Sequence, residues 1–309
     1  MKITSKTFDN IKQCVYAGTC ERRIRTLLVP WGMPMLTART TTFALQPTID
    51  QINTLNEYLN VQLGPAFGAD WIAAADLAAD RVWYDTLARR IATVRQVDDR
   101  RYVAMTLFGS YLWQPIVASV GCYLAARRVP ELRPDRIMLH VDDKGWADRL
   151  ALRSGRFAAL PDDLAATDDL VTVVADREAL RAYLIEQITE HYLPPMIDQM
   201  RTRSPLGKRA LWATVADRIV GSVLWLAKEL GIADRCRDEA AALVQSAPLQ
   251  GKTGVLLVTH NDRTEPFLKR GSCCYSYKLA DHGYCSTCPL QPVEERVRRL
   301  QDYMAQNAH

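Results

Sequence analysis

The sequence predicts an α+β protein that is predominantly helical, with a helical body, a small central antiparallel sheet and a cysteine-rich C-terminal segment. Three observations carry this prediction. Apolar residues recur at helical spacing along most of the 309 residues. Between residues 136 and 174, short apolar runs alternate with turn-forming residues, which is typical of strands. Four of the eight cysteines fall within residues 270–290.

The composition bounds the class of protein. A hydrophobic fraction of 48% and a charged fraction of 24% are typical of a globular protein. The 39 basic and 35 acidic residues are mixed along the chain and leave a net charge of +4, so we expect no nucleic-acid partner. The opening residues, MKITSKTFDNIKQC, lack the apolar run of a secretory signal. We therefore expect a cytoplasmic protein whose clustered cysteines serve metal or redox chemistry.

Changes in pattern divide the chain into three regions. Residues 1–130 form an N-terminal helical region. Residues 131–262 form a central sheet and helical region, in which we expect the substrate pocket. Residues 263–309 contain the cysteine segment and a closing helix.

The N-terminal region begins with short strands, which we expect at Ile24–Val29 and Thr40–Leu45. Thr48 and Gln51 then have the spacing of a capping box, which predicts the start of a helix. Its apolar face contains Ile49, Ile52, Leu55 and Leu59. A longer helix is expected from about Asp70 to Gln96.

Twenty-five uncharged residues lie between Arg101 and Arg127, enough to span a membrane by length. This stretch also contains polar residues, and arginine pairs flank it on both sides, so it lacks the charge asymmetry of a spanning helix. We expect a buried central helix that is kinked or broken near Pro115. Peripheral membrane association stays open.

The middle of the chain reads as a small meander of strands. The expected strands are Arg136–Val141, Ala147–Leu152, Phe157–Leu160 and Val171–Val174. Asp142-Asp143-Lys144-Gly145 has the composition of a hairpin turn, which explains the paired acids better than catalysis does.

Helices then resume. Asp176 is placed to cap a helix whose stripe is Leu180, Leu184, Ile188 and Tyr192, and Pro194-Pro195 interrupt it. The remaining expected elements are a helix from Pro205 to Gly231, a helix at Arg235–Gln245, a buried strand at Val255–Val258 and a helix after Pro292.

The cysteine segment has the pattern Cys-Cys-x10-Cys-x2-Cys, from Cys273-Cys274 to Cys285 and Cys288. Four thiolates are soft ligands that suit zinc or iron–sulfur clusters. A single zinc ion usually takes two knuckles with a spacer in each, but the first pair here has none. A 2Fe-2S cluster asks for only two cysteines per iron and is a broader target, so the spacing favours it over zinc. A structural zinc site remains the alternative.

The residues Cys273–Leu290, CCYSYKLADHGYCSTCPL, resemble the C-terminal signature of the FhuF-like ferric-siderophore reductases. In that family the four cysteines hold a 2Fe-2S cluster, and Pro-Leu commonly follows the last cysteine, as Pro289-Leu290 do here. The basic lead-in Lys269-Arg270 and the tyrosines between the cysteines are also similar. The resemblance implies that the metal ligands are Cys273, Cys274, Cys285 and Cys288.

Upstream, the stretch Ala210–Leu226 resembles a helix found before the cluster region in that family. Family members often carry Gly-Asn after the tryptophan of this helix, whereas Ala213-Thr214 follow Trp212 here. No role of that asparagine is therefore carried over, and no catalytic or substrate-binding residue is assigned.

The resemblance implies a ferric-siderophore reductase that releases iron by one-electron reduction of Fe(III) to Fe(II). Arg270 and Lys278 are candidates for a basic face toward the chelate, or are ordinary exposed charges. No flavin or nicotinamide fingerprint is evident, so we expect a separate electron donor such as a ferredoxin or an NAD(P)H-dependent reductase. The alternatives are an iron–sulfur electron carrier or sensor without its own substrate, and a siderophore- or partner-binding protein with a structural zinc.

The other cysteines and histidines are not expected at the metal. Cys14 and Cys20 have no known ligand spacing, and Cys122 and Cys236 lie in predicted helices as small core residues. The histidines are expected to be structural or exposed, namely His140, His191, His260 and, within the cysteine segment, His282.

Overall fold

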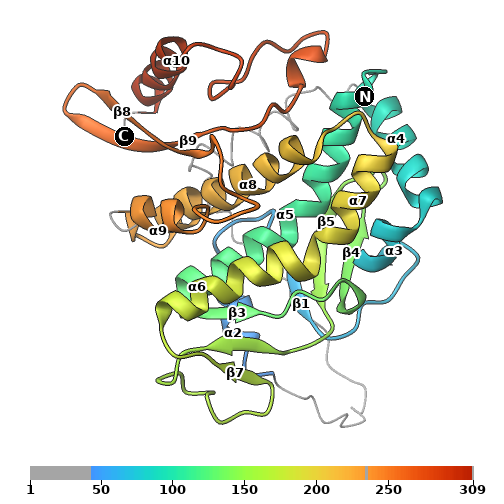
Figure 1. Cartoon of the computed structure of the whole chain (residues 1–309), viewed down its shortest axis with the longest axis vertical. Helices are drawn as coiled ribbons and strands as arrows, with labels where there is room; N and C mark the ends of the chain where they lie inside the picture. The colour runs from blue at the N-terminus through green and yellow to red at the C-terminus, as the bar shows by residue number, and fades with distance from the viewer. Residues whose placement is uncertain (1–42, 234–235, 308–309) are drawn as a thin grey trace, which may run out of the picture.

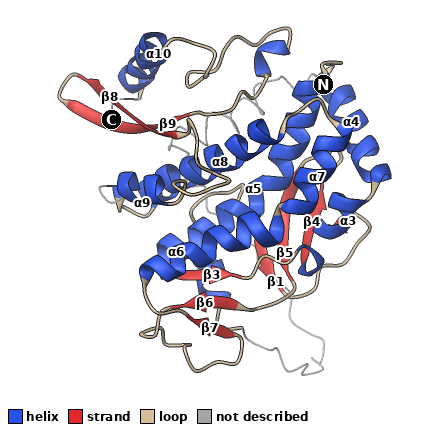
Figure 2. Cartoon of the chain, in the orientation of Figure 1, coloured by secondary structure: helices blue, strands red, loops and turns tan. Residues whose placement is uncertain are grey.

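Helices dominate the regular structure of residues 43–233 and 236–307, which a computed structural model of the chain describes (Figure 1). The helices are α2 (Gln46–Asn53), α3 (Ala74–Ala79), α4 (Arg81–Arg95), α5 (Arg100–Ala126), α6 (Arg177–Glu186), α7 (Pro194–Arg203), α8 (Lys208–Glu229), α9 (Cys236–Ala242) and α10 (Val293–Gln306). The strands are β1 (Val61–Leu63), β2 (Trp71–Ala73), β3 (Arg128–Pro130), β4 (Ile137–Val141), β5 (Ala147–Leu152), β6 (Phe157–Ala159), β7 (Val171–Val173), β8 (Gly254–His260) and β9 (Arg263–Lys269). The predicted α+β class with predominant helix is confirmed (Figure 2).

The central helix α5 is buried along almost its whole length, as predicted. It begins at Asp99, whose carboxylate accepts the backbone N–H groups of Arg101 and Tyr102. The chain stays helical through Pro115 rather than breaking there. Proline has no N–H, so the carbonyl of Tyr111 loses its partner one turn back. The phenolic hydroxyl of Tyr192 donates to that carbonyl at 3.0 Å and replaces the missing bond.

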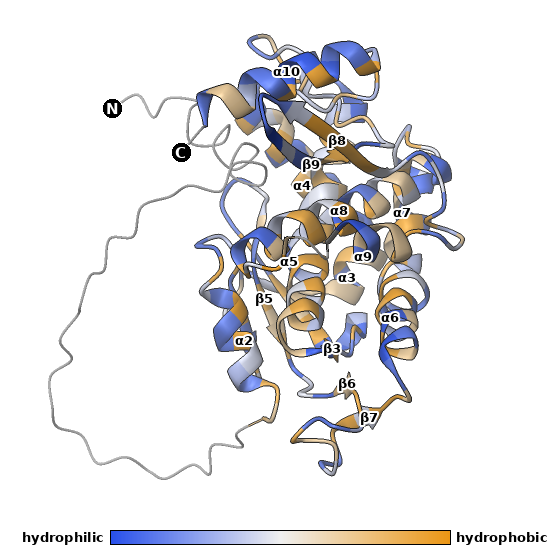
Figure 3. Ribbon diagram, turned by 90° about the vertical axis from the view of Figure 1, so that its left-hand side faces the viewer, coloured by the Kyte–Doolittle hydropathy of each residue, from blue (hydrophilic) through white to orange (hydrophobic). Residues whose placement is uncertain are grey.

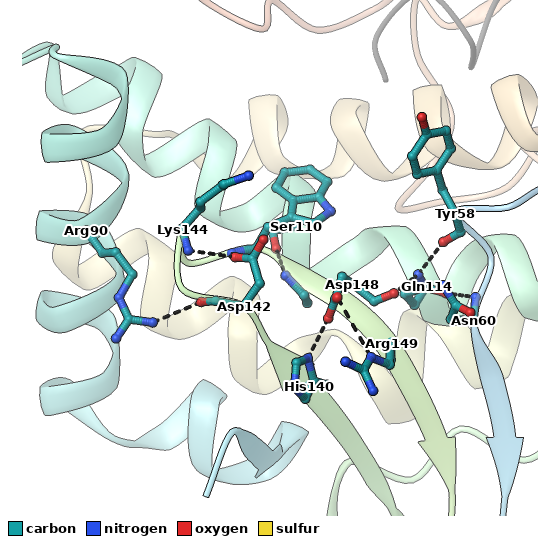
Figure 4. Close-up of polar contacts among 12 residues, drawn as sticks. Tyr58, Asn60, Arg90, Ser110, Gln114, His140, Asp142, Lys144, Asp148 and Arg149 are labelled. Carbon is teal, nitrogen blue, oxygen red and sulfur yellow. Dashed lines mark hydrogen bonds and ion pairs between the residues drawn. The ribbon is translucent and has the colours of Figure 1, made fainter. Parts of the chain in front are cut away.

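Two helices, α5 and α8, are long and apolar enough to cross a membrane by length and composition alone. Inside the protein, 89% of the most apolar window of α5 and 78% of that of α8 are buried. Core helices of soluble proteins pass the same test, so this observation is weak evidence for a membrane span. In α5, the fully buried Gln114 also bonds backbone groups of Tyr58, Asn60 and, in strand β5, Asp148 (Figure 4).

The start of the described region differs from the prediction. Helix α2 begins at Gln46 with Pro47 in its first turn, so Thr48 lies inside the helix and forms no capping box. The helix ends at Asn53, and Leu55 and Leu59 lie beyond it. The strand predicted at 24–29 lies outside the described residues, as do Cys14 and Cys20. Of the strand predicted at 40–45, residues 43–45 are described, and they lead into a turn.

The single helix predicted from about Asp70 to Gln96 is wrong. Three elements occupy this stretch: strand β2, helix α3 and helix α4. Asp80 separates the two helices because its extended backbone and its side chain, which accepts the N–H of Val82, form the N-cap of α4. An aspartate inside an apolar helical pattern can therefore end one helix and start another.

Two small sheets replace the predicted meander. The hairpin β4–β5 is antiparallel as predicted, and Asp142 holds its turn by accepting the N–H groups of Lys144 and Trp146. Strand β1 adds parallel to β5, giving the order β1-β5-β4-β2. Strands β6 and β7 join β3 in a separate sheet of order β3-β6-β7, in which β6 and β7 are parallel. The meander fails because the loop after β6 returns the chain to the same end before β7.

The helices after residue 176 follow the prediction except for α7, which was not predicted and fills the stretch that begins at Pro194-Pro195. The Asp176 carboxylate accepts the N–H of Ala179, and the predicted stripe is fully buried. The stripe continues through a π-helical turn, Gln187–Tyr192, before α7 begins at Pro194. Helix α8 begins three residues after Pro205, at Lys208, and the chain turns at Gly231 with φ +67°.

The C-terminal part is a layer on top of α8 (Figures 1 and 3). The hairpin β8–β9 lies between α8 and α10. Successive residues of β9 point to opposite sides, so Leu268 packs near Gly221 of α8 while Phe267 meets Tyr303 of α10 edge-on. The predicted strand at Val255–Val258 exists, but only Val258 is buried, because β8 is one arm of a hairpin at the surface.

Candidate metal centre

The four cysteines lie on the segment that connects β9 to α10, beside the beginning of α5 (Figure 1). Cys273, Cys274 and Cys285 are half-buried, and Cys288 is 2% exposed. Three of the predicted ligands are thus partly accessible to solvent, and the fourth is buried. A short helical turn, Ser276–Lys278, separates the two cysteine pairs.

The adjacent pair sits on a turn that its own sulfurs help to hold. The backbone N–H of Tyr275 donates to Cys273 Sγ at 3.4 Å, and Cys274 Sγ lies 3.1 Å from Ser276 Oγ. Tyr275 has φ +57°, in the left-handed region that residues other than glycine rarely adopt. The left-handed backbone thus follows the adjacent pair directly and turns the chain into the short helical turn at Ser276–Lys278.

The second pair sits on a tight turn fixed to α10. The N–H of Cys288 donates to the carbonyl of Cys285 at 3.0 Å, which closes the Cys-x-x-Cys turn. From α10, Arg299 Nη1 donates to the carbonyl of Tyr284 at 2.6 Å. Helix α10 therefore helps to hold the turn that carries the second pair.

The thiols of the two pairs interact with one another. A hydrogen bond with Cys274, together with burial, raises the pKa of the Cys285 thiol well above its usual range. Burial also raises the pKa of Cys273, and the neighbouring Cys274 and Cys288 contribute in the same direction. Like charges thus resist joint ionisation of the thiols until a cation balances them.

The donor set fits a two-iron cluster. Its four soft sulfurs come in two pairs, and each iron of such a cluster takes two protein ligands. Within the residues described, no three His, Cys, Asp or Glu side chains are arranged so that they could hold one ion.

A buried carboxylate that sequence reasoning missed controls the approach to the first pair. Asp217, on α8 and 5% exposed, accepts the N–H of Gly271, the N–H and hydroxyl of Ser272, and the hydroxyl of Thr253. Arg270 completes the set with an ion pair. Asp217 is the only acid between Arg209 and Lys228, which was the available signal.

The two basic candidates lie in different environments. The Arg270 side chain is 14% exposed and its Nε lies 3.5 Å from Asp217 Oδ2, so it is not an exposed charge and is directed into the protein. Lys278 is 41% exposed; its Nζ lies 3.7 Å from Asp99 Oδ2 and 5.4 Å from the centre of the Tyr277 ring. Of these two cations, only Lys278 presents its charge at the surface.

Two tyrosines between the cysteine pairs meet at the surface. The rings of Tyr277 and Tyr284 lie 5.2 Å apart, and Tyr284 is 41% exposed. His282 is half-buried in the same loop, with its N–H bonded to the carbonyl of Leu279. The loop therefore has an aromatic outer face with Lys278 beside it.

The remaining candidates lie elsewhere. Cys122 is fully buried in α5, and burial raises its thiol pKa to about 12. Cys236 lies in α9. His140 Nδ1 is 2.6 Å from Asp148, as Figure 4 shows, and His191 Nε2 is 3.2 Å from Glu186, which agrees with structural roles.

Trp212 and Thr214 are buried in α8, and Ala213 between them is half-buried. Thr214, at the place where the similar family often has asparagine, bonds the carbonyl of Ala210 at 2.9 Å and lies 3.3 Å from Met105 Sδ. Its hydroxyl is thus occupied inside the helix pair α5–α8.

Comparison with known families matches two consecutive parts of the chain. Residues 106–266 match the family model described as ferric iron reductase FhuF-like transporter. Residues 270–290 match the model described as FhuF 2Fe-2S C-terminal domain, so the cofactor of this segment is a 2Fe-2S cluster. No curated protein sequence matches the chain.

Proposed function

The chain belongs to the family of ferric iron reductase FhuF-like transporters, and from this premise we propose that it reduces the iron of a ferric siderophore by transfer of one electron. The single observation that carries the proposal is the segment with two cysteine pairs held between α8 and α10. Membership of the family supports a reductase of the broad ferric-siderophore type. We propose in addition which residues bind the cluster, how the electron reaches the iron and which residues contact the substrate.

In this proposal Cys273, Cys274, Cys285 and Cys288 hold the 2Fe-2S cluster. The cluster supplies one electron at a time, so Fe(III) in the chelate becomes Fe(II) while no bond in the protein is made or broken. The hard oxygen donors of siderophores suit Fe(III) better than Fe(II), so the reduced ion is released more readily.

The protein's own residues keep the centre accessible and oriented. Three of the proposed ligands are half-buried, so a chelate at the surface comes near them without entering the core. The turn closed by Cys288 N–H and Cys285 carbonyl fixes the second pair. A fixed donor limits the rearrangement that accompanies each electron transfer.

The proposed contact surface for the chelate consists of Tyr277, Lys278 and Tyr284. The aromatic rings offer faces for flat ligand groups, and the lysine offers a positive charge for anionic chelates. This surface lies on the loop between the two cysteine pairs.

A separate protein, such as a ferredoxin or an NAD(P)H-dependent reductase, is proposed to return the electron. The proposed setting is the cytoplasm, because thiols that serve as ligands must stay reduced. The described cysteines are free thiols, namely Cys122, Cys273, Cys274, Cys285 and Cys288.

The test uses the full chain purified without oxygen. The visible spectrum and the iron, sulfide and zinc contents are measured first. The protein is then reduced with dithionite, excess reductant is removed, and ferric siderophores with hydroxamate or catecholate donors are added. We expect a coloured protein that reoxidises as Fe(II), trapped by a ferrous chelator, appears in a one-to-one ratio with electrons.

Two results would contradict the proposal. A colourless protein with stoichiometric zinc indicates a structural staple. A cluster that bleaches with dithionite but does not reoxidise with any ferric siderophore indicates an electron carrier or a sensor.

A further inference from the structure

The carboxylate of Asp217 accepts four hydrogen bonds, from Thr253, Gly271 and Ser272, and forms an ion pair with Arg270. Its Oδ1 accepts the Gly271 N–H and the Thr253 hydroxyl, each at 2.7 Å. Its Oδ2 accepts the N–H of Ser272 at 3.0 Å and the hydroxyl of Ser272 at 2.6 Å. Five contacts, including the ion pair with Arg270, thus converge on one side chain that is 5% exposed.

This arrangement requires an aspartate rather than an asparagine. Each of its two oxygens accepts a backbone N–H, one from Gly271 and one from Ser272. An amide at this position has one oxygen and one NH₂ group, and either flip of the amide turns the NH₂ group against a backbone donor. A buried donor that faces another donor loses its hydrogen bond and costs stability.

Asp217 joins both ends of the hairpin β8–β9 to α8. Thr253 directly precedes β8, and residues 270–272 directly follow β9. The closure is tight, because a Cβ added at Gly271 would lie 2.5 Å from Thr253 Oγ1 and 3.0 Å from Thr253 N. Since Cys273 is the next residue after Ser272, the carboxylate fixes the direction from which the chain enters the first cysteine pair.

Asp217 also balances the positive charge nearest to the thiols in the lead-in. Arg270 lies three residues before Cys273, and its Nε is 3.5 Å from Asp217 Oδ2. Its ion pair with Asp217 is mostly shielded from water, with exposed side-chain fractions of 14% and 5%. Buried pairs are screened less by salt than surface pairs, so removing either partner leaves a strong local charge.

We propose that Asp217 is the positioning residue of the metal centre: it fixes the entry to Cys273-Cys274 and, by neutralising Arg270, sets the reduction potential of the bound cluster. The inference rests on the proposed cysteine ligands. Reduction adds one negative charge to a centre that is already anionic, so an unbalanced cation nearby favours the reduced form and an unbalanced anion disfavours it.

The test compares Asp217→Asn, Arg270→Gln and the double variant, each as the full-length protein with its cluster. The midpoint potential is measured by redox titration of the visible spectrum, alongside iron and sulfide content. We expect Asp217→Asn to raise the potential, Arg270→Gln to lower it, and the double variant to return toward the wild-type value. We also expect lower cluster content in Asp217→Asn, because the entry to the first pair is no longer fixed.

Glu239→Gln is the matched control. Glu239 is a mostly buried carboxylate that bonds Arg181 and Tyr123, on α9 away from the cysteine segment (Figure 1). We expect this variant to lose stability, measured by thermal unfolding, while its cluster content and potential stay at the wild-type values.

The outcomes separate the inference from the proposed function. A wild-type protein without a 2Fe-2S cluster overturns the proposed function. A wild-type protein with the cluster, in which the two single variants leave the potential unchanged or shift it in the same direction, overturns the role of Asp217. If Asp217→Asn does not fold, Arg270→Gln alone decides the electrostatic part, because an unchanged potential in that variant contradicts it.

Discussion

Tyr192 donates its hydroxyl to the carbonyl of Tyr111 at 3.0 Å, and the two rings stack with their centres 4.9 Å apart. The carbonyl is the one that Pro115 leaves without an intrahelical donor. A residue from the π-helical turn after α6 therefore completes the hydrogen bonding of α5, and the longest helix among the described residues tolerates a proline in its middle.

Tyr192→Phe is expected to destabilise the protein by about 1–3 kcal/mol, because it leaves a buried carbonyl without a donor. The measurement is urea unfolding followed by circular dichroism. The same change made in a Pro115→Ala background should cost less, because alanine restores the N–H that Tyr111 needs. Equal costs in both backgrounds would show that the hydroxyl has no such role.

Gly271→Ala is expected to lower cluster content strongly. The new methyl group would meet Thr253 at distances that require the lead-in to move away from Asp217. Gly283→Ala is the control, since this glycine lies in the same segment and has no atom within 4 Å of an added Cβ. Iron and sulfide analysis of both variants provides the comparison, and similar losses in the two would argue against steric closure at Gly271.

Cys285→Ser is expected to abolish or alter the cluster, whereas Cys122→Ser should leave it intact. Cys285 lies in the segment with the other three thiols, and Cys122 is fully buried in α5. The visible spectrum and iron content of the two variants decide the matter. Equal loss in both would contradict the ligand assignment.

Asp163→Asn is expected to destabilise the protein at pH 7 and to matter progressively less in acid. Two hydrogen bonds from Arg128, each 2.8 Å long, hold the pKa of the Asp163 carboxyl below its ordinary value of 3.8. A pKa lowered by folding contributes stability that is full above the unfolded pKa and is lost as the pH falls through the folded one. Unfolding free energies of both proteins at pH 7 and pH 3 measure this.

Asp162→Asn serves as the control for that prediction. Its side chain is 75% exposed and its contact with Arg127 is 3.7 Å long. Exposed pairs contribute little, so the variant should resemble the wild type at both pH values. A difference for Asp163→Asn that stays constant with pH would mean that its charge is not what Arg128 stabilises.

Local chemistry in the sequence predicted the elements that depend on it. The turn at Asp142–Gly145, the cap at Asp176 and the fully buried stripe from Leu180 to Tyr192 all exist as predicted. Pairing between distant segments was not predictable in the same way. Strand β1 is too short to show a pattern, and its partner β5 lies almost ninety residues further along the chain.

The residues of the site show the same difference between local patterns, which the sequence reveals, and contacts between distant segments, which it does not. The spacing of the four cysteines in the sequence predicts a metal site. Asp217, in contrast, contacts its partners only when α8 and the hairpin β8–β9 pack together. In the sequence it was one acid in an apolar run, 54 and 55 positions before Gly271 and Ser272. Arg270 was considered for the outer surface because sequence alone does not show that a buried carboxylate lies behind it.

The two apolar clusters that form the core of the described residues contain none of the four proposed ligands. The contacts that hold the core together are therefore separate from the proposed metal centre. Loss of the cluster would leave these core contacts in place, so the proposed activity would depend on reloading one segment rather than on refolding the whole chain.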